Sequence, residues 1–364
     1  MKSGSGMGTG NADWDVESYT TGMDSAKSAC RHEETGIRLT DRPVKAGEVL
    51  TFAQLSDPHL SSLEGIRFSE VINKRLLGYL SWHRRRRLEH RSEILDALGR
   101  DLVQMKPDHI VVTGDLTHIG LQQEFIEART RLRNLGSATG VTVIPGNHDA
   151  YVASRWEESF AMWLPFMVSD KDRDASHIRS RDTLYPSLRV RGPIAFIGLS
   201  SAWPSAPFLA TGRLGSRQLD RLPGLLEQAG RDGLFRVVLL HHPPHPEDEK
   251  WRKRLVDGRE LCAQLEQHGV DLLLHGHTHR PMRSRVKTPS GNAPVIGIPS
   301  ASAAGKRPGS GAQYNLYRVA RKTDSWSVNI SVRGYENNQD RFVAAGEEEL
   351  NLPLHVQGSD CPPG

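Results

Sequence analysis

Five short segments of this 364-residue chain carry side chains that bind metal ions, and each directly follows an apolar run. They are Asp57-Pro58-His59, Gly114-Asp115, Gly146-Asn147-His148-Asp149, His241-His242 and Gly276-His277-Thr278-His279. One such segment alone would indicate little, because a single His or Asp at a strand end is commonly a surface or capping residue. Together the five supply seven ligands, Asp57, His59, Asp115, Asn147, His241, His277 and His279, which is enough for two adjacent ions.

The ligand types indicate which ions would bind. Carboxylate, amide and imidazole groups without a thiolate suit Mn, Fe or Zn rather than a structural thiolate zinc. Two ions about 3.5 to 4 Å apart need a shared carboxylate, and together they can polarise a water and hold a phosphate. Asp115 is the predicted bridge.

The apolar runs before these segments predict the strands that position them. Leu50 to Leu55, Ile110 to Thr113, Val141 to Ile144, Val237 to Leu240 and Leu272 to Leu274 have the length of strands buried on both faces. The loops that leave the carboxyl ends of such strands lie along one rim, so the five loops should converge on one crevice. Gly114, Gly146 and Gly276 would permit tight turns there.

The flanking elements are also predicted from periodicity. Apolar residues recur at helical spacing over Ile94 to Met105 and over Phe125 to Leu135, which predicts helices before and after the Asp115 strand. Stretches 295–298, 313–320 and 326–332 predict strands that form the antiparallel side of a second sheet.

The order of the five segments resembles the calcineurin-like metallophosphoesterase superfamily. Its pattern of Asp-x-His, Gly-Asp, Gly-Asn-His-Asp/Glu, His and Gly-His-x-His is matched without a gap from about Leu50 to about Ile298. The resemblance implies an α/β fold in which two packed mixed β-sheets are flanked by helices, a four-layer α-β-β-α sandwich. It also implies hydrolysis of phosphodiester or phosphomonoester bonds by a hydroxide that bridges two metal ions.

The resemblance further implies a role for each residue. Asp57, His59, Asp115 and His279 would hold the first ion, and Asp115, Asn147, His241 and His277 the second. His148 would face the substrate, stabilising a phosphoryl oxygen or protonating the leaving group, with Asp149 orienting it. An alternative of another class is a metal-free interaction scaffold, but scaffold members of the superfamily have lost ligands that this chain retains.

Departures from particular branches narrow the expected substrate. Leu116-Thr117-His118 follows Asp115 and Asp149 follows His148, which is unlike the Ser/Thr protein phosphatases. The motifs look like the bacterial branch that includes class III cyclic-nucleotide phosphodiesterases and glycerophosphodiesterases. A small phosphoester or nucleotide-type substrate is therefore expected.

A basic block lies between the first two segments. Arg84, Arg85, Arg86 and Arg87 stand within the segment 67–91, after apolar residues at helical spacing from Phe68 to Leu80. This segment is either a basic amphipathic helix at an anionic membrane or a packed helix with solvated arginines. Because the segment follows the Asp57 loop, these arginines are predicted to contact substrate phosphate. His118 is also predicted to contact substrate, and its alternatives are a position behind the ligands or one that faces solvent.

The same segment suggests a second candidate substrate. Residues 73–79 resemble a stretch of the UDP-2,3-diacylglucosamine diphosphatases of this superfamily, which makes a lipid-linked pyrophosphatase at the membrane surface the alternative function. Nucleic acid is a disfavoured partner, because the single basic run lacks interleaved aromatic residues.

Composition predicts one enzyme domain with tails. A net charge of +4 is mild, and Cys30, Cys262 and Cys361 give neither a disulfide framework nor a thiolate site. No apolar run approaches the ~18 residues of a membrane span or forms a signal peptide, so a cytoplasmic protein is expected, peripheral to the inner face of the membrane if the basic helix binds there. We expect a disordered tail over 1–47, the domain over 48–345 and a loose tail over 346–364.

Overall fold

A computed structural model describes residues 38–40, 42–60, 63, 66, 71–84, 86–172, 174–305 and 311–354, apart from the side chains of Arg86 and Ser176. These residues belong to one unit. Most of the expected N-terminal tail, residues 1–37, and the final residues 355–364 lie outside the described residues.

The first of two sheets has six strands in the order β12-β11-β10-β1-β2-β3. Its members are β1 (Val49–Leu55), β2 (His109–Thr113), β3 (Val141–Ile144), β10 (Gln313–Arg321), β11 (Ser325–Glu336) and β12 (Arg341–Pro353). Strands β1, β2 and β3 are parallel, whereas β10 to β12 add antiparallel strands beside β1. The predicted strands at 313–320 and 326–332 therefore extend the sheet of β1, and the expectation that they belong to the other sheet is wrong.

The second sheet also has six strands, in the order β4-β5-β6-β7-β9-β8. Its members are β4 (Ser187–Arg191), β5 (Ile194–Gly198), β6 (Phe235–Leu239), β7 (Leu272–His275), β8 (Met282–Thr288) and β9 (Gly291–Gly297). The four central strands are parallel, and β4 and β8 form antiparallel edges. Strands β6 and β7 carry two of the predicted apolar runs.

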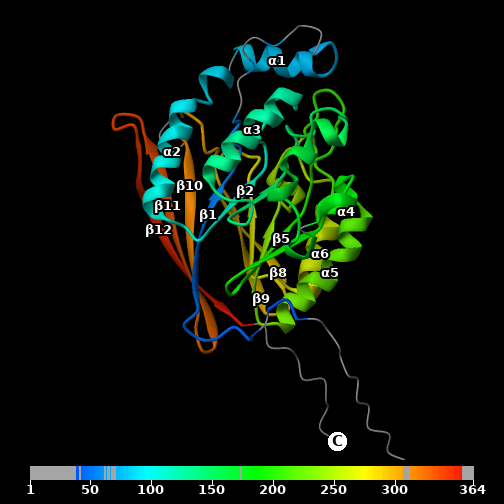
Figure 1. Cartoon of the computed structure of the whole chain (residues 1–364). Helices are drawn as coiled ribbons and strands as arrows, with labels where there is room; N and C mark the ends of the chain where they lie inside the picture. The colour runs from blue at the N-terminus through cyan, green and yellow to red at the C-terminus, as the bar shows by residue number, and fades with distance from the viewer. Residues whose placement is uncertain are drawn as a thin grey trace, which may run out of the picture. The chain divides into compact units, whose positions relative to one another are not determined.

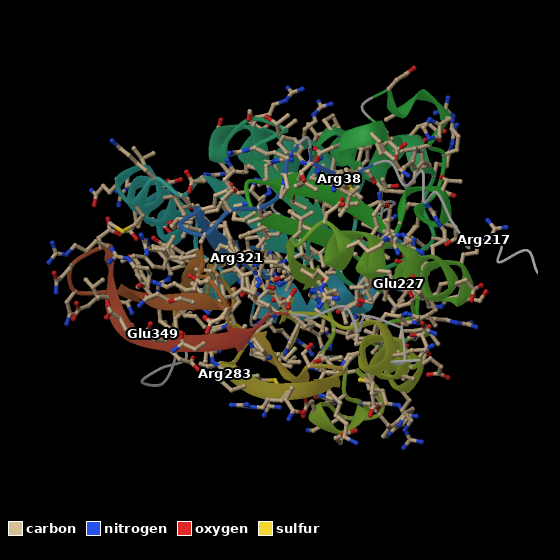
Figure 2. All side chains as sticks on the ribbon, turned by 90° about the horizontal axis from the view of Figure 1, so that it is seen from below. Arg38, Arg217, Glu227, Arg283, Arg321 and Glu349 are labelled. Atoms are coloured by element: carbon tan, nitrogen blue, oxygen red, sulfur yellow. The ribbon has the colours of Figure 1, made fainter. Side chains whose placement is uncertain are left out.

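The two sheets pack face to face through one apolar core. The ring of Phe52 on β1 meets the edge of Phe196 on β5 at 5.1 Å and stacks on Tyr317 at 4.8 Å. At the border of the sheets, Arg283 Nε on β8 donates to Glu348 Oε2 on β12 at 3.0 Å. Figure 2 shows Arg283 beside the strand that carries the neighbouring Glu349.

Helices cover the outer faces of both sheets (Figure 1). Helices α2 (Ser92–Met105) and α3 (Gln122–Leu135) pack on the first sheet, and α5 (Ser216–Arg231) and α6 (Gly258–His268) pack on the second. The shorter elements are α4 (Arg181–Leu184) and the 3-10 turns η2 (Arg86–Leu88), η3 (Trp156–Glu158), η4 (Phe160–Phe166), η5 (Asp170–Asp172), η6 (Ala175–His177) and η7 (Pro246–Asp248). This arrangement confirms the predicted four-layer α-β-β-α sandwich.

Helix α1 (Arg75–Arg84) lies above the ends of the strands (Figure 1). The Arg75 guanidinium fixes it by donating to the carbonyl oxygens of Ile119 at 3.1 Å and Gly120 at 2.6 Å. Gly78 faces Ile119 so closely that a Cβ there would lie 2.5 Å from Ile119 Cγ2. The helix is thus held against the loop after β2, although residues 67–70 of the expected basic segment lie outside the described residues.

The C-terminal boundary differs from the prediction. Strand β12 pairs with β11 from Glu336↔Arg341 to Ser325↔Pro353, so residues 346–353 belong to the sheet and the expected loose tail from 346 is wrong for them. The run Glu347-Glu348-Glu349 is polar because β12 is an edge strand, where charged side chains are common. Within the described part of the chain, no helix is long and apolar enough to cross a membrane.

Candidate metal centre

The loops after β1, β2, β6 and β7 are joined by backbone hydrogen bonds at one end of the sandwich. The amide of Asp57 donates to the backbone carbonyl of Gly114 at 3.0 Å, and the amide of His59 donates to the backbone carbonyl of Asp115 at 3.1 Å. In the second sheet the amide of Gly276 donates to the carbonyl of His241 at 3.0 Å. Between the sheets, the amide of His277 donates to Asp57 Oδ2 at 3.0 Å, so the predicted ligands of both sheets meet in one place.

Asp57, His59 and His279 form a first group of candidate ligands. Their ligand atoms all lie within 4.8 Å of one another. His279 Nε2 is 3.1 Å from Asp57 Oδ1, and His59 Nδ1 lies 2.8 Å from the carbonyl oxygen of Thr117. Because that carbonyl accepts a hydrogen bond from Nδ1–H, the lone pair of His59 is on Nε2, a buried atom without a hydrogen-bond partner among the described residues. A metal ion would satisfy it.

Asp57, Asp115 and His241 form a second group within 4.8 Å, which Asn147 and His277 adjoin. The His241 Nδ1 atom is 2.7 Å from the carbonyl of Thr113, so Nε2 is the nitrogen whose lone pair would bind an ion once its proton is displaced. That nitrogen faces Asn147 Oδ1 at 3.2 Å and Asp115 Oδ2 at 3.3 Å. Electron pairs that converge in this way fit a cation between them.

Asp57 belongs to both groups, whereas Asp115, the predicted bridge, belongs to the second. Asp115 Oδ1 accepts the backbone N–H of His148 at 2.7 Å, and its other oxygen faces His241. The bridging role of Asp115 stays a prediction.

The backbone is strained at most of the candidate ligands. Five of the seven have positive φ: Asp57 at 49°, His59 at 42°, Asp115 at 56°, His277 at 68° and His279 at 53°. For residues other than glycine this conformation costs on the order of 1 kcal/mol or more each, and it clusters at functional sites. Such strain is a physical sign that the loops are built for a site.

The three glycines of these loops have two different roles. Gly114 has a φ of +98°, as the predicted tight turn requires, and a Cβ there would lie 2.5 Å from His241 Nδ1. Gly146 and Gly276 have no such φ, and side chains there would collide with Asp115 and Ser56. Gly146 and Gly276 are therefore needed because the backbone lies too close to neighbouring residues for a side chain, and not because of a turn.

Burial and charge favour a cation at this centre. Burial by itself raises the pKa of Asp57, but the charge of His279 outweighs burial and holds that pKa well below its usual range. Burial lowers the pKa of His241, but the charge and hydrogen bond of Asp115 raise it to about 9. Burial, with neighbouring imidazoles, lowers the pKa of both His59 and His277. Asp57 is therefore ionised and His59 and His277 are neutral, whereas His241 carries a second proton that a divalent ion would displace on binding.

Asp149 organises the loops. Its carboxylate accepts hydrogen bonds from the amides of Asp115, Leu116, Thr117 and Gly146 at 2.8 to 3.0 Å, and from the hydroxyl of Thr117. Burial and the charge of Asp115 raise its pKa to about 7, against the effect of these donors. The expected orientation of the His148 ring by Asp149 is not what the contacts show: His148 Nδ1 lies 2.5 Å from the carbonyl oxygen of His118 instead.

Glu124 in turn holds the His118 loop. Its carboxylate accepts the amides of His118 at 2.6 Å, Ile119 at 3.1 Å and Leu121 at 3.0 Å. Sequence reasoning missed this residue, although a Glu in the first turn of a helix is a recognisable capping signal. His242, which follows a ligand, contacts Ser201 Oγ at 2.7 Å and the carbonyl of Ala210 at 3.1 Å, and its ring lies 4.2 Å from that of His277.

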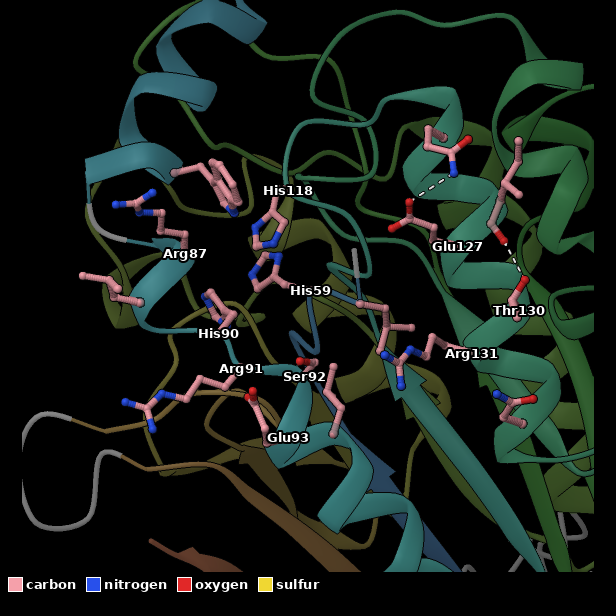
Figure 3. Close-up of a pocket in the computed structure, with 17 residues that line it drawn as sticks. His59, Arg87, His90, Arg91, Ser92, Glu93, His118, Glu127, Thr130 and Arg131 are labelled. Carbon is pink, nitrogen blue, oxygen red and sulfur yellow. Dashed lines mark hydrogen bonds between the residues drawn. The ribbon is translucent and has the colours of Figure 1, made fainter. Parts of the chain in front are cut away.

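Sequence reasoning also missed His90, which lies in the basic segment 67–91. Its ring lies 4.3 Å from that of His59, and Glu89, His90 and His279 form a third group within 4.8 Å. The ring of His118 stacks on that of His59 at 4.8 Å and lies 5.6 Å from that of His90. Figure 3 shows the rings of His59, His90 and His118 together at one cavity.

Two cavities flank the candidate ligands. The first, of about 890 Å³, is lined by His59, His90, His118, Trp82 and Arg87 at one end and by α3 at the other (Figure 3). The second, of about 400 Å³, is lined by Asn147, His148, Lys74, Tyr151 and Phe208. Helix α1 contributes to both, through Trp82 and Gly78.

The arginine block is only partly described. Arg87 lines the first cavity and Arg84 is exposed at the end of α1. Arg85 and the side chain of Arg86 lie outside the described residues. Substrate contact by these arginines and by His118 stays a prediction.

Comparisons with known proteins agree with this geometry. Residues 50–281 match the family described as calcineurin-like phosphoesterase. A dimetal phosphatase from Danio rerio is similar in structure, with a TM-score of 0.55 and 15% identity over 86% of this chain and 100% of that one.

Two further similar structures are the Vacuolar Protein Sorting 29 proteins of Cryptosporidium parvum and Chaetomium thermophilum. The first is 12% identical over 84% of this chain and 100% of that one, with a TM-score of 0.33. The second is 9% identical over 84% and 97%, with a TM-score of 0.34. Of the three structures, the phosphatase alone has a TM-score that indicates a common fold. No curated protein matches the sequence.

Proposed function

Because this chain belongs to the calcineurin-like phosphoesterase family, we propose that it hydrolyses phosphodiesters with two divalent ions. The observation that carries the choice of a diester is the pair of cavities beside the candidate ligands, one reaching His59 and the other Asn147 and His148. A phosphodiester carries two alcohol groups on phosphorus, whereas a monoester carries one. With two cavities, each of the two alcohol groups of a diester can bind in its own cavity.

The candidate ligands fit the ions that the family implies. His59 and His241 each have one ring nitrogen held by a backbone carbonyl, which leaves the other nitrogen to bind an ion. The ligand types suit Mn, Fe or Zn. Two such ions, when bound, would polarise the phosphoryl group and lower the pKa of a water.

His148 is positioned to act on the substrate. Its half-buried ring lines the second cavity, and the His118 carbonyl fixes the proton on Nδ1. A protonated ring also carries a proton on Nε2, which it would transfer to the departing alkoxide. His148 is thus the proposed general acid, while the amides held by Asp149 keep its loop in place.

A lipid-linked diphosphate is the second candidate substrate. Lys74, Lys250, Arg252 and Lys253 line the second cavity, and this number of cations suits a substrate with two phosphates. A metal-free scaffold is disfavoured, because all seven candidate ligands are present and five are held in strained conformations.

Competing model esters test the preference for a diester. The purified chain, loaded with Mn²⁺, should hydrolyse bis(4-nitrophenyl) phosphate with a higher kcat/KM than 4-nitrophenyl phosphate. A clear preference for the monoester would overturn the proposal.

Variants that fill one cavity at a time test the two-cavity argument. Thr130→Trp in the first cavity and Ser81→Trp in the second should each raise KM for the diester, because both residues line their cavity from an exposed helix face. The monoester, with one alcohol group, should respond to one of them at most. Thr130→Val, which keeps the size of the side chain, is the control.

A further inference from the structure

Helix α1 is apolar on two faces. One face packs: Gly78 and Trp82 are buried, and Trp82 joins a small core with Leu63, Ile119 and Leu121. The other face is exposed: Leu77 and Leu80 are 38% and 41% accessible, and Ile72, just before the helix, is 66% accessible. A helix that has already buried one apolar face has no folding reason to carry a second.

Two neighbouring loops continue this exposed apolar face. Phe208 is 78% accessible and has a φ of +65°, while Trp251 is 66% accessible. Lys74 Nζ on the α1 side donates to the carbonyl of Ser205 at 2.7 Å, and the amide of Ala210 donates to the carbonyl of Arg252 at 2.8 Å. Hydrogen bonds therefore join α1, loop 203–210 and loop 249–254 into one surface.

This surface surrounds the mouth of the second cavity. Leu77 and Phe208 line the cavity that also contacts His148. We call Ile72, Leu77, Leu80, Phe208 and Trp251 the rim residues. An aromatic residue held exposed in a strained backbone, at the entrance of a catalytic cavity, indicates a surface that something else covers.

Cations alternate with the rim residues. Lys74, Lys250, Arg252 and Lys253 line the same cavity, and of the described residues that line it Glu249 alone is acidic. Arg84 follows Leu77 and Leu80 at helical spacing and is exposed. Exposed aliphatic and aromatic groups interspersed with Lys and Arg are what an anionic lipid surface binds.

We propose that the rim residues dock this protein on an anionic bilayer, with the mouth of the second cavity toward the lipid. The apolar groups enter the headgroup region while the cations meet lipid phosphates. The docking itself is independent of the proposed function. A corollary rests on that function: the substrate is a phosphoester carried by an amphiphile, which reaches His148 from the membrane.

Vesicle sedimentation tests the docking. The full chain should pellet with vesicles of equal parts phosphatidylglycerol and phosphatidylcholine, and much less with phosphatidylcholine alone or in high salt. Replacing Lys250 and Arg252 by Gln should weaken binding about 5-fold each, or about 30-fold together. Absence of wild-type binding to the anionic vesicles would overturn the inference.

An apolar variant separates docking from catalysis. The triple change Ile72→Ser, Leu80→Ser and Trp251→Ser should weaken vesicle binding about tenfold or more. These three residues do not line either cavity, so turnover of bis(4-nitrophenyl) phosphate should survive. Turnover by a wild type that binds no vesicles would refute the docking alone, whereas vesicle binding without turnover would refute the proposed function alone.

Matched controls test whether removing exposed apolar groups or cations anywhere on the surface weakens vesicle binding. Val103→Ser with Met105→Ser removes exposed apolar groups from α2, and Arg217→Gln with Arg259→Gln removes exposed cations from α5 and α6. Both should leave vesicle binding unchanged. If they weaken it as much as the rim variants do, binding is not specific to the rim and the inference fails.

Discussion

The substitution Glu124→Gln tests how the fold positions the proposed general acid. In the wild type one carboxylate oxygen accepts the amide of His118, and the other accepts those of Ile119 and Leu121. The glutamine oxygen can keep the two amides that share an acceptor. Its NH₂ group then faces the amide of His118, and a buried donor is left unpaired, which costs about 1–3 kcal/mol.

The same change should affect catalysis through the loop. The carbonyl of His118 holds Nδ1 of His148, so an unpaired His118 amide should loosen the His148 ring. We expect kcat to fall by about tenfold, part of the 10²- to 10⁴-fold that a general acid contributes. The loss should be larger for a poor leaving group than for nitrophenolate.

Urea unfolding and steady-state kinetics provide the assay. Glu127→Gln, one turn along α3, is the matched control, because its carboxylate accepts a hydrogen bond from the exposed side chain of Gln123 at 3.1 Å. It should change stability by less than about 0.5 kcal/mol. A Glu124→Gln variant that equals this control in stability and in kcat would refute the positioning argument.

His148→Ala should retain both metal ions and lower kcat by about 10²- to 10⁴-fold, less for nitrophenolate; equal losses for good and poor leaving groups would contradict proton donation. Burial lowers the pKa of His109 from 6.5 to about 3, so the wild type should lose stability relative to His109→Gln as pH falls below 6.5. The loss should approach about 1.4 kcal/mol per pH unit in urea unfolding, and parallel pH curves would contradict it. Gly78→Ala places a Cβ 2.5 Å from Ile119 Cγ2, so it should displace α1 and raise KM for a diester at unchanged metal content; an unaltered KM would show that α1 does not shape the cavities.

The parts of the fold that could be predicted from the sequence are those in which burial alone determines which residue types occur. Strands β1, β2, β3, β6 and β7 are mostly apolar because helices and a second sheet cover both of their faces. Their carboxyl ends lie along one rim, so the sequence alone predicts that the ligands after them lie together. Strand β12 was missed because an edge strand alternates polar and apolar residues, and its glutamates resemble an acidic tail.

The parts of the site that could not be predicted depend on contacts between distant loops. Glu124 and His90 become functional candidates only when their neighbours, the His118 amide and the His59 ring, are known. The exposed apolar face of α1 was hidden for a related reason. The helical spacing of the apolar residues does not say which of them are buried. The structure shows that Trp82 is buried whereas Leu77 and Leu80 face solvent.

The number of divalent ions bound per chain tests the central claim most directly. Saturation with Mn²⁺, followed by removal of free metal and elemental analysis, should give two ions for the wild type and fewer for Asp115→Asn, because that carboxylate is the predicted bridge between the ions. Hydrolysis should be lost in the same variant while the fold survives. Wild-type protein that is folded but binds no metal, or an Asp115→Asn variant with two ions and near wild-type turnover, would contradict the account.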